Sequence, residues 1–94
     1  MIDYCLQNAD EAEFNQLMLD TGLCVEVTEG EEAVIVPADY TVLIDRIGPI
    51  TIGEITYPEY YSNLRLLNGA TEDQATALAV YAIDPSQPQY RTWL

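Results

Sequence analysis

Carboxylates are the side chains of this sequence that are best able to do chemistry. The 94-residue chain has 16 Asp and Glu residues against three Arg, and it contains no His. A carboxylate pair can perform acid–base hydrolysis, but among so many acidic groups a close pair is expected by chance and indicates nothing. The run Glu29-Gly30-Glu31-Glu32 offers oxygen ligands for a hard divalent cation. Because it lacks the spacing of a calcium-binding EF-hand loop, we expect no metal site and no cofactor site.

The lack of His excludes several classes of enzyme site. It removes the Ser–His and Cys–His nucleophile pairs, His-ligated zinc and the usual near-neutral acid–base group. A chain this short also has little room for both a core and a substrate cleft. We therefore expect a non-enzymatic protein without catalytic residues. Cys5 and Cys24 form no Cys-x-x-Cys motif and are expected to be reduced core residues, with a disulfide between them as the alternative.

The net charge of −13 restricts the partners. Nucleic-acid binding depends on cations that displace counterions from phosphates, and this chain offers only Arg46, Arg65 and Arg91. The same charge opposes contact with an anionic membrane, whereas a basic protein surface would attract the chain. We expect a protein partner with a basic or aromatic-accepting surface, no direct nucleic-acid contact and no membrane contact. Homo-oligomer formation is left open.

The carboxylates are concentrated early in the chain, since only Glu72, Asp73 and Asp84 follow residue 59. The expected acidic surface consists of Asp10, Glu11, Glu13, Asp20, Glu26, Glu29, Glu31 and Glu32. Duplex DNA carries about one charge per 1.7 Å, so a surface this acidic has enough charge to imitate a nucleic-acid backbone. The alternative is a solvated acidic face that keeps the protein in solution.

Aromatic side chains form the second candidate surface. The residues expected to bind a partner are Tyr57, Tyr60, Tyr61, Tyr90, Arg91 and Trp93. Tyr and Trp often anchor protein interfaces because they bury a large area with little loss of side-chain entropy. The alternative is that they pack on the chain's own sheet. An apolar terminus is expected to dock either on its own domain or on a neighbouring molecule.

The first half of the chain predicts a strand, a helix and a hairpin. Residues 1–7 alternate as in a strand. Asn8 as N-cap and Glu11 as its capping-box partner predict a helix over residues 9–21. Its core-facing stripe is Phe14, Leu17, Met18 and Thr21. Residues 24–28 and 33–36 predict the two strands of the hairpin.

The second half predicts further strands and one more helix. Strands are expected at residues 40–45, 50–55 and 60–67, separated by Pro and Gly. Thr71 and Gln74 form a second capping box, which predicts a helix that ends near residues 78–81. Residues 80–84 fit a helix end or a last strand equally well. The expected architecture is a single acidic α+β domain over residues 1–94, with two helices on one face of a mostly antiparallel sheet. A ferredoxin-like topology is a special case of it.

Four segments in the last third of the chain form a recognisable combination: Tyr61–Arg65, Gln74–Ala79, Asp84-Pro85 and Pro88–Trp93. With a looser match at the acidic helix near the start, this combination resembles a group of short phage and prophage proteins encoded near tail and tail-fibre genes. Many members have an Asn-x-Arg strand followed by a Pro-x-x-Arg-x-Trp-like tail. The resemblance implies a phage origin and a link to tails, and it brings no catalytic residues.

Two functions follow as expectations. The first is a non-enzymatic phage accessory or structural protein that acts by protein–protein contact in tail or tail-fibre assembly. It would act in the host bacterial cytoplasm, with association with the virion as an option. The second is an acidic nucleic-acid mimic that inhibits a host DNA-binding defence protein, of the anti-restriction or anti-CRISPR type. Arg65 and Arg91 are expected to be neutralised by nearby carboxylates.

Overall fold

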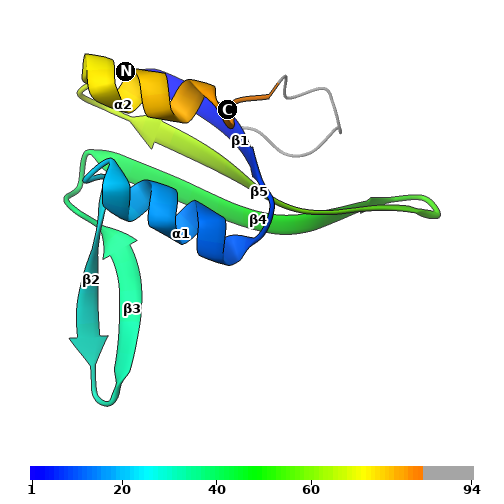
Figure 1. Cartoon of the computed structure of the whole chain (residues 1–94), viewed down its shortest axis with the longest axis horizontal. Helices are drawn as coiled ribbons and strands as arrows, with labels where there is room; N and C mark the ends of the chain where they lie inside the picture. The colour runs from blue at the N-terminus through cyan, green and yellow to red at the C-terminus, as the bar shows by residue number, and fades with distance from the viewer. Residues whose placement is uncertain (84–94) are drawn as a thin grey trace.

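The computed structural model describes residues 1–83, which form five strands and two helices (Figure 1). In chain order they are β1 (Ile2–Asn8), α1 (Glu11–Asp20), β2 (Cys24–Glu29), β3 (Glu32–Pro37), β4 (Val42–Ile52), β5 (Ile55–Leu66) and α2 (Glu72–Ala79). The expected α+β class is confirmed.

The strands form two separate antiparallel sheets. In the larger sheet β5 is central, with β1 on one side and β4 on the other. β2 and β3 pair only with each other within residues 1–83. The order β1-β5-β4 does not confirm a ferredoxin-like topology.

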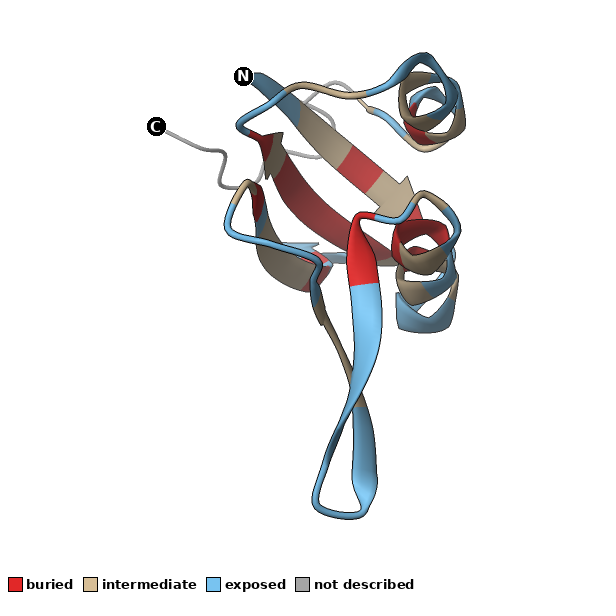
Figure 2. Cartoon of the chain, turned by 90° about the vertical axis from the view of Figure 1, so that its left-hand side faces the viewer, coloured by how far each residue is buried: buried red, intermediate tan, exposed pale blue. Residues whose placement is uncertain are grey.

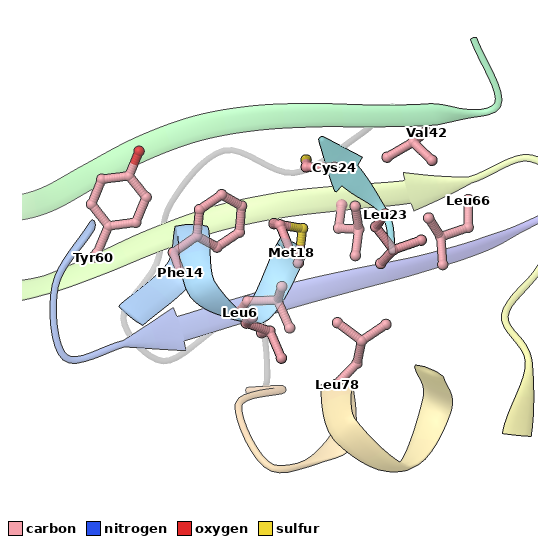
Figure 3. Close-up of a cluster of buried hydrophobic side chains, with 11 residues drawn as sticks. Leu6, Phe14, Met18, Leu23, Cys24, Val42, Tyr60, Leu66 and Leu78 are labelled. Atoms are coloured by element: carbon pink, nitrogen blue, oxygen red, sulfur yellow. The ribbon is translucent and has the colours of Figure 1, made fainter. Parts of the chain in front are cut away.

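Both helices cover the same face of the three-stranded sheet. Leu6 of β1 and Leu64 of β5 point from this face into the core, where they meet Phe14 and Met18 of α1. Leu78 of α2 closes the cluster on the side of β1, as Figure 3 shows. All five side chains are fully buried, so this cluster joins the sheet to both helices.

The first helix begins later than the sequence indicates. Asp10 is the N-cap, since its carboxylate accepts the backbone N–H of Glu13 at 2.8 Å. The Glu13 carboxylate in turn accepts the backbone N–H of Ala9 at 3.0 Å. Asn8, expected as the cap, is instead the buried last residue of β1, so its backbone belongs to the sheet. The predicted capping box of Thr71 and Gln74 is confirmed at α2.

The middle of the chain forms a longer hairpin than expected. β4 runs unbroken from Val42 to Ile52, so the division into strands 40–45 and 50–55 is wrong. Gly48, with a positive φ of 78°, lies at a β-bulge in β4. Because Pro49 has no backbone N–H to donate to the neighbouring strand, the bulge allows the strand to continue past it. β5 likewise begins well before residue 60.

The chain beyond α2 returns to the free edge of β1, the edge that faces away from β5. The backbone N–H of Gln7 donates to the carbonyl of Tyr81 at 2.9 Å, and that of Ile83 donates to the carbonyl of Cys5 at 2.8 Å. Only one isolated bridge, between Leu6 and Ala82, is formed within the described residues. Residues 80–83 are therefore neither a helix nor a full strand.

Candidate protein-binding surfaces

The β2–β3 hairpin projects from the rest of the chain, as Figures 1 and 2 show. Cys24 at its base is buried in the core, whereas every other residue of β2 is exposed. At the far end Gly30 and Glu31 connect the strands, and the φ of Gly30 is 65°. Glycine adopts this left-handed conformation without steric cost, which permits the tight turn.

One side of this hairpin is apolar and faces away from the core. Val25 lies opposite Val36, and Val27 lies opposite Val34. Because side chains alternate along a strand, these four valines share one side, which we call the valine face. Val25 and Val27 are 43% and 37% exposed. The other side carries Cys24 and Ile35, which contact the core.

Four exposed glutamates lie on the hairpin that carries the valine face. They are Glu26, Glu29, Glu31 and Glu32. Glu29 and Glu32 are directly opposite each other in the register, on the same side as the valines. Residues 24–37 contain no cation, so nothing within the hairpin itself neutralises these charges.

The far half of the β4–β5 hairpin is the second projection, which we call the arm (Figure 1). Ile52 pairs with Ile55 next to the turn, and Ile50 pairs with Tyr57 two residues further along each strand. All four side chains lie on the same side of the arm. Ile52 is 44% exposed and Ile55 is 60% exposed. Ile52 and Ile55 were not among the residues expected to bind a partner, although their alternation with Thr51 and Thr56 around a Gly turn is a readable signal.

The described aromatic candidates differ in how far the fold buries them. Tyr57, on the arm, is half-buried. Tyr60 and Tyr61 are 8% and 1% exposed, which corrects the expectation that they bind a partner. The Tyr60 ring contacts Phe14 with the ring centroids 5.5 Å apart, so it belongs to the core. Burial raises the pKa of both phenols.

The three terminal candidates fall outside the described residues. They are Tyr90, Arg91 and Trp93. Their predicted part in partner binding stays a prediction.

Arg46 lies in a hollow between α1 and β3. The hollow has a volume of about 260 Å³ and is lined by Glu11, Asn15, Ala33, Val34, Ile35 and Arg46. The guanidinium carbon of Arg46 lies 5.0 Å from the Phe14 ring centre, and its Nη1 donates to Asn15 Oδ1 at 2.9 Å. Nη1 also donates to the Tyr60 hydroxyl at 3.3 Å. These contacts show that Arg46 joins β4 to α1.

The expected acidic surface is distributed over α1 and the β2–β3 hairpin. Its members are exposed except for Glu13, which is half-buried. Asp10 and Glu13 accept backbone hydrogen bonds at the start of α1, so both have a structural role there. Within residues 1–83 no three His, Cys, Asp or Glu side chains are grouped closely enough to hold a metal ion.

Arg65 is neutralised as expected. Its Nε and Nη2 donate to the two carboxylate oxygens of Asp3, each at 2.8 Å, in a two-pronged pair between β5 and β1. This pair lowers the pKa of Asp3. Cys5 and Cys24 are both free thiols, but only Cys24 is the buried core residue that was expected, because Cys5 is half-buried and lies outside the core cluster. Burial raises the pKa of Cys24.

The comparisons with known proteins assign no relative to this chain. No protein-family model matches it, and neither the curated proteins nor the solved structures contain a match. Within residues 1–83 no helix is long and apolar enough to cross a bilayer.

Proposed function

We propose that this chain is a non-enzymatic protein that acts by contact with other proteins. The observation that carries the proposal is the collection of exposed apolar side chains on two projecting hairpins. Ile52 and Ile55 extend at the end of the arm, and Val25 and Val27 extend from the other hairpin. Exposed apolar groups on projecting elements are typical of surfaces that a partner covers.

The biological setting of the proposal comes from the resemblance of residues 60–94. On that basis the contacts serve phage tail or tail-fibre assembly, with the protein as an accessory or structural component. We propose that it acts in the host bacterial cytoplasm, where assembly takes place, and that association with the virion follows from assembly.

The test uses the proteins encoded by the neighbouring genes, purified and mixed one at a time with this chain. We expect one of them to form a complex that is detected by size-exclusion chromatography and calorimetry. Ile55→Lys places a charge at the exposed end of the arm and is expected to abolish the complex. Val80→Lys is the matched control, because Val80 is 73% exposed and lies away from the arm at the end of α2.

Two results would overturn the proposal. One is that none of the proteins encoded by the neighbouring genes binds this chain. The other is equal loss of the complex in Ile55→Lys and Val80→Lys, which would show that any added cation disturbs it.

The alternative function is an acidic mimic of nucleic acid that occupies a defence protein. It is favoured by the four exposed glutamates of the β2–β3 hairpin and by the absence of cations from residues 24–37. A mimic's affinity for a basic nucleic-acid-binding protein falls steeply between roughly 50 and 200 mM salt, because the attraction is electrostatic. A complex that depends on Ile55 is expected to respond only weakly over the same range.

A further inference from the structure

We infer that the outer edge of β2 binds an extended, basic segment of a partner protein as a third strand. The inference rests on the proposed protein-binding function, but not on its assignment to phage tails. It concerns the β2–β3 hairpin and not the arm, so its failure would leave the test with Ile55→Lys unaffected.

The β2–β3 hairpin has an open edge within the described part of the chain. Within residues 1–83, β2 and β3 form a two-stranded sheet that no further strand extends. An isolated two-stranded sheet is only marginally stable in water, and an unpaired edge offers backbone donors and acceptors to an added strand. β2 is the more accessible edge, because Val25–Glu29 are all exposed whereas Val34–Val36 of β3 are half-buried.

The side chains along β2 form a pattern that an added strand can match. Val25, Val27 and Glu29 lie on the valine face, and Glu26 lies on the opposite side. A strand added beside β2 places its own side chains next to these residues on the same sides. The segment that fits therefore has apolar residues next to Val25 and Val27, and Lys or Arg next to Glu26 and Glu29.

The hairpin carries negative charge that no cation within residues 24–37 compensates. Glu29 and Glu32 face each other across the hairpin, and like charges in directly opposed positions destabilise a sheet. A cation supplied by the partner next to Glu29 would convert this repulsion into attraction. A second copy of this chain is disfavoured at the same edge, since its own hairpin would add negative charge there and no cation.

The test uses synthetic peptides as probes. The main probe is Thr-Val-Lys-Val-Thr-Lys-Thr, together with its reversed sequence, so that parallel and antiparallel strands are both sampled. One control peptide has Glu in place of Lys, and another has Thr in place of Val. Binding to the full-length ¹⁵N-labelled protein is followed by amide chemical shifts in NMR titrations.

We expect one of the two Lys-Val probes to shift the amides of residues 24–29 in a saturable manner, and both control peptides to bind more weakly. The double variant Val25→Thr, Val27→Thr leaves the charge unchanged and keeps β-branched residues. It is expected to weaken binding about tenfold, through the loss of two apolar cross-strand contacts. Glu26→Gln, Glu29→Gln is expected to weaken binding and to reduce its salt dependence, whereas Ile55→Thr on the arm is expected to have no effect.

Each contrary result overturns a definite part of the inference. Shifts that map to other residues, or no saturable shift with either Lys-Val probe, would exclude an added strand at β2. Equal binding of the Thr-for-Val control, or no effect of the double valine variant, would indicate a purely electrostatic contact, as in nucleic-acid mimicry. A dimer of the protein alone in ultracentrifugation, dissociated by the double valine variant, would identify a second copy as the occupant.

Discussion

Replacing Ser62 with Ala is expected to stabilise the protein, although most substitutions of buried residues destabilise. Ser62 is 0% exposed in the centre of β5, where it pairs with Leu6 on one side and Arg46 on the other. It lies on the same side of the sheet as Leu64 of the core. Its hydroxyl oxygen has no hydrogen-bond partner within residues 1–83.

The magnitude follows from two opposing contributions. A buried hydroxyl without a partner costs about 1–3 kcal/mol, and Ser62→Ala removes that cost. The substitution leaves a void of roughly 10 Å³, which costs about 0.2 kcal/mol. The net gain is about 1 kcal/mol or more, and in a domain of this size each 1 kcal/mol raises the melting temperature by about 4–8 °C.

The assay is thermal and urea unfolding followed by circular dichroism. Thr56→Val is the control, because it removes an exposed hydroxyl from the same strand and keeps a β-branched side chain. We expect a melting temperature near that of the wild type for Thr56→Val and a clear increase for Ser62→Ala. A decrease for Ser62→Ala would refute the reasoning, since it would show that the hydroxyl contributes favourable contacts.

Three further predictions concern the capping box and two titratable groups. Thr71→Ala is expected to lower the free energy of unfolding by about 1 kcal/mol in urea unfolding, because it removes the N-cap of α2, whereas Thr76→Ala in the same helix leaves it nearly unchanged. Burial raises the pKa of Tyr60, so its contribution to stability is present below pH 10 and is lost as the pH rises through the folded-state pKa. Urea titrations from roughly pH 9 to 11 should therefore show a steeper loss of stability for the wild type than for Tyr60→Phe, and equal slopes would contradict this. In a Cys5→Ser background the Cys24 thiol, which is buried and has a raised pKa, should react with a disulfide reagent only as fast as the chain unfolds. A fast reaction in native buffer would show that Cys24 is accessible.

The parts of the fold that depend on local signals were predictable from the sequence. The capping box that begins at Thr71 and the apolar stripe of Phe14, Leu17 and Met18 predicted both helices, and the structure confirms them. The first N-cap was assigned wrongly because Asn8 and Asp10 are both good capping residues. Only the pairing of Asn8 with Tyr60 in the sheet shows which of them belongs to a strand.

The parts that depend on distant contacts were not predictable in the same way. Pro49 indicated a break, whereas the long ladder between β4 and β5 holds the strand together across the bulge at Gly48. Tyr60 and Tyr61 are typical interface residues by type, and only their burial shows that this chain covers them itself. The valine face could not be predicted from the sequence, because it depends on the strand register that places Val25 opposite Val36.

The central position of β5 has a consequence for biosynthesis. β1 and α1 leave the ribosome first, but the strand beside β1 ends only at Leu66. Until β5 emerges, the side chains of Leu6 and Phe14 are not covered by the sheet. The nascent chain is therefore prone to aggregate through these exposed apolar side chains during this period. β4 and β5, joined by a tight turn, can pair as soon as both are synthesised, and β1 then completes the sheet by a long-range and slower step. A chain that stops before Ile55 would therefore lack both β5 and α2, and its first helix, α1, would have no complete sheet to pack on.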